Sequence, residues 1–270
     1  MTQIEQPPVT QPALRFVSLR RAWYRVRRSP LTLLGAAIMI IVLFLMLFSP
    51  WLVPHNPDAI DLTARLLPPS ANHWFGTDEV GRDLFSRVLV GSRQSVAAGL
   101  AVVVLAGGIG SLLGCFSGVI GGTVDALIMR CMDIMLSVPS LVLTMALAAA
   151  LGPSLFNAML AIAVVRIPFY VRLARGQTLT LRHQAYMQAA RTFGASRWHL
   201  IGWHVLRNVM PPLVVQASLD IGTAILMAAT LGFIGLGAQQ PTAEWGRWWP
   251  TAVIMYSTSG GIQPFPERRS

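Results

Sequence analysis

The sequence contains no lysine, and its 21 permanently basic side chains are all arginines. A phosphate-binding loop of the form GxxxxGK[ST] needs a lysine, so this chain cannot hydrolyse ATP through that motif. Cysteine is scarce as well. Cys115 and Cys131 lie in or beside apolar runs without metal-ligand spacing and are expected to be small packing residues. No other cluster of potential ligands stands out, so we expect no metal site and no cofactor in this chain.

Charge of either sign is in short supply. Only 12% of the residues are charged and 54% are hydrophobic, which is outside the usual range of soluble domains and typical of a polytopic membrane protein. The formal net charge of +10 could indicate a nucleic-acid partner. The arginines, however, fall between apolar runs rather than on one continuous face, so we exclude nucleic-acid binding.

The first apolar run, Leu31–Val53, has no charged residue and is long enough to cross about 30 Å of hydrocarbon. An arginine-rich stretch at 14–28 precedes it and is expected to form a helix on the membrane surface. The positive-inside rule therefore predicts a cytoplasmic N-terminus. The polar segment 54–93 should lie on the other side of the membrane and be partly folded, because its spacing becomes helix-like after Asp78.

Further apolar runs predict four more membrane spans, with prolines at 139 and 168 disturbing two of them. A short loop that holds Asp125 and Arg130 is expected between the second and third spans. An even number of crossings returns the loop after the fourth span to the cytoplasm, and its many arginines agree. The predicted spans are 96–120, 134–151, 155–171 and 209–236.

Glycine recurs at every fourth residue along the second span. On a helix this spacing places the glycines in one ridge, where the backbone of another helix can approach closely. The alternative is that membrane helices simply tolerate glycine. The predicted ridge consists of Gly110, Gly114, Gly118 and Gly122.

The loop YMQAARTFGASRWHLIGWHVLRN, residues 186–208, interrupts this apolar chain with three arginines and two histidines. Tyr186, Ala190 and Phe193 lie at i, i+4 and i+7 and predict one apolar stripe of a short helix. Gly194 suits its end, and Ser196 suits the start of a second helix. We expect two short helices joined by a sharp bend, which either enter a partner's groove or lie on the membrane.

The stretch QAARTFGASRWHL, followed by HVLRN, resembles the "EAA…G" cytoplasmic loop of bacterial ABC importer permeases. In that family the loop is the coupling helix that docks on the ATP-hydrolysing subunit. Gln188 stands where the motif has Glu, and Arg207 stands where the family usually has Pro. The resemblance implies that the coupling residues are Gln188, Ala189, Ala190, Gly194, Ala195 and Ser196.

The resemblance covers almost the whole chain. HWFGTDEVGRDLFSRVLVGSR and LGFIGLGAQQPTAEWG are similar to the C-type permeases of dipeptide, oligopeptide, nickel and glutathione importers, and AIDLTARLLPPSANHWFGTDEVGRDLFSRVLVGS to their D,D-dipeptide branch. This implies an all-α helical bundle of the type I ABC importer permease kind in the bacterial inner membrane. It also implies a homologous second permease, two ATP-binding subunits that hold ATP and magnesium, and a periplasmic substrate-binding protein. Oligopeptide, glutathione and nickel stay open as cargo.

The resulting organisation runs from a cytoplasmic tail to a periplasmic one. Its parts are a tail with an interfacial helix at 1–30, a first span at 31–53, a periplasmic loop at 54–93, a core permease domain at 94–238 with a coupling loop at 174–208, and an aberrant tail at 239–270.

Two ionisable residues fall within predicted spans, Arg166 in the fourth and Asp220 in the fifth. Charge in lipid is costly, so such residues need a reason to be there. They could match the carboxylate and ammonium of a dipeptide on the substrate path. Alternatively, they pair with each other or with the second permease, or Arg166 reaches the membrane surface.

The end of the sequence departs from the family, which continues from EWG into a sixth span. Residues 248–256 are too short to cross a bilayer and contain Pro250. One back-translation of residues 248–267, read in a shifted frame, resembles the family's continuation, so we hypothesise a frameshift near Arg247. The chain would then have five spans, with a tail outside the cytoplasm and weak or no transport. A membrane-embedded enzyme and a passive channel are the rival classes, but no catalytic cluster appears, and a channel needs no docking loop.

Overall fold

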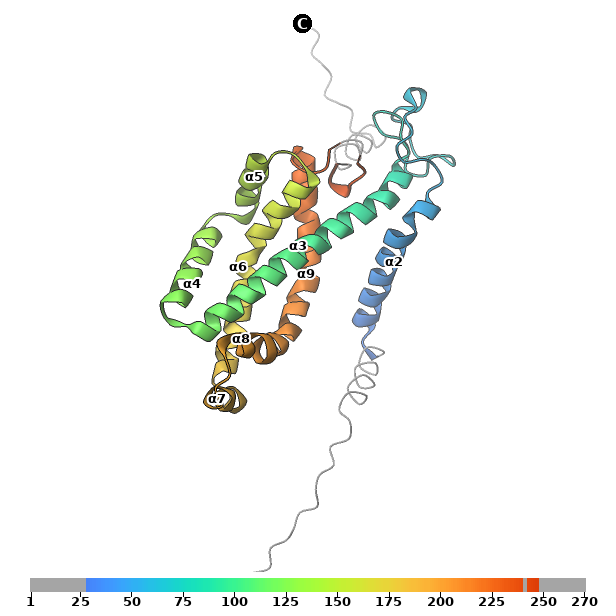
Figure 1. The fold of residues 1–270 in the computed structure, drawn as a ribbon. Helices are drawn as coiled ribbons and strands as arrows, with labels where there is room; N and C mark the ends of the chain where they lie inside the picture. The colour runs from blue at the N-terminus through green and yellow to red at the C-terminus, as the bar shows by residue number, and fades with distance from the viewer. Residues whose placement is uncertain (1–27, 240–241, 248–270) are drawn as a thin grey trace, which may run out of the picture.

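Long apolar helices dominate the computed structural model, which describes residues 28–239 and 242–247 (Figure 1). Over those residues the fold is all-α, as predicted, with one isolated bridge between Thr77 and Asp83 in place of any strand. Four helical stretches are long and apolar enough to cross a membrane, and a bent helix pair raises the number to five. The four are α2 (Pro30–Leu52), α3 (Leu84–Ile120), α6 (Leu155–Arg182) and the stretch Arg197–Ile234, which contains α9 (Leu206–Ile234).

The third predicted span is a broken one. Helices α4 (Gly122–Ser137) and α5 (Ser140–Leu151) meet at an angle of 93°. Pro139 lies at the break, and the residue before it, Val138, is extended, as a residue before proline prefers. The break agrees with the expected effect of Pro139.

The short loop predicted around Asp125 and Arg130 is wrong, because both residues lie inside α4. Asp125 is tolerated there because it accepts two hydrogen bonds of 2.6 Å from Arg175 on α6, and one from Ser117 on α3. Only Gly121, with φ at +67°, separates α3 from α4. The charge of Asp125 does not mark a loop, because its partners lie on other helices.

Three helices extend beyond the predicted limits. Helix α3 starts at Leu84, so residues 84–93 of the predicted loop are helical. Asp83 caps this start by accepting the Ser86 N–H at 2.8 Å. Helix α6 runs on to Arg182, so the connecting loop begins near 183 rather than 174. Helix α9 starts at Leu206, directly after one turn of π-helix, η2 (Leu200–Val205).

Helices α3 and α6 pack against each other through small residues. A Cβ atom at Gly110 would lie 2.6 Å from the Tyr170 Cβ, and one at Gly114 would lie 2.4 Å from the Val171 oxygen. Gly118 meets Thr178 in the same way, at 2.7 Å. These distances leave no room for a side chain, so glycine permits the approach.

Gly122 is a correction to the predicted ridge. A Cβ atom there would meet nothing within 4 Å, because α3 has already ended and Gly122 is the first residue of α4. The spacing of four residues therefore continues in the sequence past the end of α3, where it no longer places the glycines on one face of a helix.

Helix α2 stands to one side of the bundle and runs beside α3 near the end that carries residues 54–83 (Figure 1). Its apolar surface is almost wholly exposed, as expected for a helix that faces lipid or another membrane subunit. The predicted surface helix at 14–28 falls almost entirely outside the described residues, and so does the tail after Arg247 with its hypothetical frameshift.

Candidate functional site

The connection between α6 and α9 projects from one end of the bundle, opposite residues 54–83 (Figure 1). It consists of two short helices, α7 (Ala185–Thr192) and α8 (Arg197–His199), followed by η2. The predicted arrangement of two short helices joined by a bend is therefore present. We call residues 185–199 the knuckle.

The bend of the knuckle is closed by main-chain hydrogen bonds. Gly194 has φ at +78°, a left-handed conformation that glycine adopts without strain. The Gly194 N–H donates to the Arg191 oxygen at 2.9 Å, and the Ala195 N–H donates to the Ala190 oxygen at 3.0 Å, as in a Schellman cap. Ser196 then caps α8 by accepting the His199 N–H at 3.2 Å.

The face that anchors the knuckle differs from the predicted stripe. Met187 is fully buried in the core, whereas Tyr186 is 42% exposed and Phe193 is 90% exposed. Phe193 follows the last residue of α7, so helical periodicity no longer sets its direction. Ala190 alone of the predicted stripe packs partly against the core.

Large apolar side chains are exposed on this end of the bundle. Phe193, Trp198 and Trp203 are 90%, 72% and 64% exposed. Gln188 and Ala189 are exposed beside them, and Gln188 donates a weak hydrogen bond to the His183 oxygen at 3.4 Å. An exposed group of aromatic side chains on a rigid support is typical of a surface that contacts another protein or a membrane.

Arg166 on α6 and Asp220 on α9 form an ion pair inside the bundle. The Arg166 Nε donates to Asp220 Oδ2 at 3.2 Å, and a second guanidinium nitrogen donates to Oδ1. Gln216 also donates to Oδ1, at 3.1 Å, and the guanidinium lies 4.3 Å from the centre of the Phe169 ring. The Asp220 side chain is 3% exposed and that of Arg166 is 12% exposed. In the structure, therefore, Arg166 and Asp220 pair with each other. Contact of either residue with a substrate stays a prediction.

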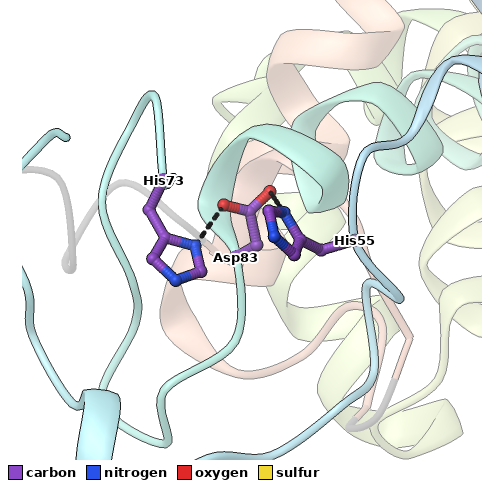
Figure 2. A group of neighbouring side chains, drawn as sticks. All are labelled: His55, His73 and Asp83. Carbon is purple, nitrogen blue, oxygen red and sulfur yellow. Dashed lines mark hydrogen bonds and ion pairs between the residues drawn. The ribbon is translucent and has the colours of Figure 1, made fainter. Parts of the chain in front are cut away.

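One side-chain cluster was missed by the sequence analysis. His55, His73 and Asp83 come together (Figure 2) in segment 54–83, which lies at the end of the molecule opposite the knuckle (Figure 1). They lie on separate segments, so no short spacing connects all three. The only signal was the pair His73 and Asp83 within HWFGTDEVGRD, which by itself is too common a combination to predict a site.

Comparison with known proteins agrees with this arrangement. The model of the family described as "Binding-protein-dependent transport system inner membrane component" matches residues 110–260, which include the knuckle. The model described as "N-terminal TM domain of oligopeptide transport permease C" matches residues 18–69.

Similar curated proteins include three bacterial permeases. A probable D,D-dipeptide transport system permease protein of Escherichia coli is 68% identical, over 93% of this chain and 89% of that protein. A di/tripeptide transport system permease protein of Pseudomonas aeruginosa is 43% identical, over 91% and 84%. A glutathione transport system permease protein of Escherichia coli is 39% identical, over 83% and 74%.

Proposed function

The chain belongs to the family of inner membrane components of binding-protein-dependent transport systems, and from this membership we propose that it carries dipeptides inward as one permease subunit of an ATP-driven importer. It would work with a homologous second permease, two ATP-binding subunits and a periplasmic binding protein. The partner ATPases would hold ATP and magnesium, and this chain would have no catalytic activity of its own.

The knuckle carries the proposal. It is anchored by Met187 and closed at Gly194, yet it presents Phe193 almost fully to its surroundings. A rigid element with an exposed aromatic side chain can transmit a movement of its partner to the bundle, because main-chain hydrogen bonds fix its shape before the partner binds. We propose that Phe193 and its neighbours dock on an ATP-binding subunit in the cytoplasm, so that closure of the ATPase dimer moves α6 and α9.

Capture of the ATP-binding subunit tests this docking. The full chain, tagged and purified in detergent, would be compared with Phe193→Ala. Because Phe193 is 90% exposed, its removal leaves the fold intact, and we expect recovery of the ATP-binding subunit to fall at least tenfold.

Trp74→Ala supplies the matched control. Trp74 is an aromatic residue that is 60% exposed and lies in segment 54–83, far from the knuckle. It should leave capture unchanged. Equal capture by wild type and Phe193→Ala would contradict docking through the knuckle.

The cargo is inferred from the relatives. The names of two of them, D,D-dipeptide and di/tripeptide permeases, support a dipeptide, and the higher identity of the first supports the D,D form. Uptake of labelled D-Ala-D-Ala by cells with the complete transport system would be measured against an excess of unlabelled L-Ala-L-Ala or glutathione. We expect unlabelled D-Ala-D-Ala to suppress this uptake far more than either competitor, and glutathione or L-Ala-L-Ala that suppresses it as strongly as unlabelled D-Ala-D-Ala would overturn the assignment.

A further inference from the structure

The cluster of His55, His73 and Asp83 joins three parts of the chain outside the membrane-spanning helices. His55 follows the end of α2, His73 lies in the connecting segment, and Asp83 caps the start of α3 (Figure 2). His73 Nδ1 lies 2.9 Å from one Asp83 oxygen, and His55 Nδ1 lies 4.0 Å from the other. One nitrogen or oxygen atom from each residue lies within 4.8 Å of the other two.

The carboxylate of Asp83 is fixed and charged. Burial raises the pKa of Asp83, but hydrogen bonds from the Ser86 hydroxyl, the Ser86 N–H and His73 outweigh burial and hold the pKa below its ordinary value. Oδ2 accepts the Ser86 N–H at 2.8 Å and the Ser86 hydroxyl at 2.6 Å and lies 4.0 Å from His55 Nδ1, whereas Oδ1 faces His73 at 2.9 Å.

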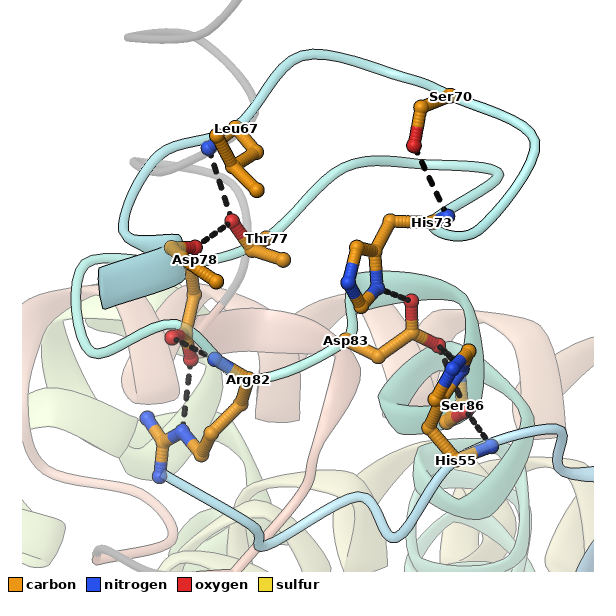
Figure 3. Close-up of polar contacts among 10 residues, drawn as sticks. His55, Leu67, Ser70, His73, Thr77, Asp78, Arg82, Asp83 and Ser86 are labelled. Carbon is orange, nitrogen blue, oxygen red and sulfur yellow. Dashed lines mark hydrogen bonds and ion pairs between the residues drawn. The ribbon is translucent and has the colours of Figure 1, made fainter. Parts of the chain in front are cut away.

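Hydrogen bonds of the main chain fix the positions of His55 and His73 (Figure 3). The His55 N–H donates to the Ser86 hydroxyl at 3.2 Å, so the serine that orients Asp83 also positions His55. The His73 N–H donates to the Ser70 hydroxyl at 3.1 Å, and its oxygen accepts from Ser70 and Gly76. Such support around candidate ligands is what a metal site needs.

A helix cap alone does not account for this arrangement. Asp83 and Ser86 already complete the cap, yet a second imidazole lies beside the first, with ring centres 5.0 Å apart. His55 is too far from Asp83 for a hydrogen bond, so nothing in the cap requires it. A cation between the two rings would bind both nitrogens and the carboxylate at once.

The distances bracket those of a zinc site. Zinc binds imidazole nitrogen and carboxylate oxygen at about 2.0–2.2 Å, which puts neighbouring tetrahedral ligands about 3.3–3.5 Å apart. The contact of 2.9 Å between His73 Nδ1 and Oδ1 would open slightly, and His55 Nδ1, which lies 4.0 Å from Oδ2, would reach the same ion by rotation of its side chain, which is 44% exposed. On binding, His73 would give up the hydrogen bond from Nδ1 to Asp83, carry its proton on Nε2 and offer Nδ1 to the ion, and water would complete the coordination.

We propose that His55, His73 and Asp83 bind a divalent transition-metal ion of the zinc type, which links the end of α2 to the start of α3. Among the described helices α2 has its main contact with α3, so a link at this point sets the position of α2 on the bundle. The site is structural and independent of the cargo.

Calorimetric titration of the full chain with zinc chloride tests the proposal. The protein would carry a tag without histidine, be purified in detergent and be treated with a chelator first. We expect one zinc ion per chain, with affinity at least tenfold lower in His55→Ala and in Asp83→Asn. Asparagine still caps a helix, so the second variant folds. Zinc should raise the melting temperature of the wild type but not that of His55→Ala.

The remaining histidines provide the controls. His199 and His204 have ring centres 5.6 Å apart at the other end of the molecule and are a rival source of binding. His204→Ala and His183→Ala should both titrate like the wild type. Zinc binding that survives in His55→Ala, or disappears in His204→Ala, overturns the proposal, as does equal binding of magnesium.

Discussion

At the scale of the residue, the pair Arg166–Asp220 separates a structural role from a transport role. Arg166→Met leaves a buried carboxylate without its partner, which is expected to cost about 3–5 kcal/mol of stability. Thermal unfolding in detergent should show a clear drop in the melting temperature. Replacement of both residues, Arg166→Met with Asp220→Leu, should recover most of it, because no buried charge remains.

Transport by the double variant then decides between the two interpretations. Uptake near the wild-type rate would mean that the pair serves packing alone. A stable double variant without uptake would instead place these side chains on the substrate path. A single Arg166→Met variant as stable as the wild type would contradict the burial of the pair.

At the scale of the element, the contact of α3 with α6 predicts opposite results for two glycines of the same helix. A Cβ atom at Gly114 would lie 2.4 Å from a main-chain oxygen of α6, whereas one at Gly108 meets nothing within 4 Å. Gly114→Ala should therefore destabilise the bundle by about 1–3 kcal/mol through overpacking. Gly108→Ala should be neutral or slightly stabilising. Equal melting temperatures for the two variants would refute this packing.

The cap of α7 gives a second prediction at this scale. Gly194 has open space around it, so only its φ of +78° restricts substitution. Asparagine tolerates this conformation and valine does not. The Gly194→Asn variant should recover as much of the ATP-binding subunit as the wild type does, and the Gly194→Val variant should recover much less. Retention by both would mean that the bend does not define the docking shape.

Helices and their order could be predicted from apolar runs, but several boundaries could not. The run 96–120 marks the apolar part of α3, whereas the helix begins where Asp83 caps it, among polar residues. Asp125 indicates a loop when the sequence is read locally, because its partner Arg175 is 50 residues away. The predicted helix boundaries are wrong where a helix cap or a partner far away in the sequence, rather than hydrophobicity, determines where the helix begins or ends.

The same limit applies to the candidate sites. The bend at Gly194 and the cap at Ser196 are local, so the sequence predicts them. The buried face of α7 is set by contact with the core, and the periodicity selected Phe193 where Met187 is buried. His55, His73 and Asp83 meet only in the folded chain, and the local pair of His73 and Asp83 is too common a combination to predict the site.

At the scale of the whole molecule, the two ends of the bundle should be accessible from opposite sides of the membrane. In a variant without Cys115 and Cys131, a single cysteine would replace either Trp74 or Phe193, both well exposed. A reagent that cannot cross membranes should label Trp74→Cys in intact spheroplasts and Phe193→Cys only in inverted vesicles. Labelling of both from one side would contradict the expected topology, with its cytoplasmic N-terminus.

Helix α3 is 37 residues long, which corresponds to about 55 Å at 1.5 Å per residue, well beyond the thickness of a bilayer. Its glycine contact with α6 lies near one end, and Asp83 lies at the other. From Gly114 to Leu84 the helix measures about 45 Å, so a tilt of about 5° at the glycine contact would displace the far end by about 4 Å. Because α3 also packs against Ile225 of α9 and against Trp245 along its outer half, such a tilt would carry these neighbours with it and couple the two membrane surfaces through one helix.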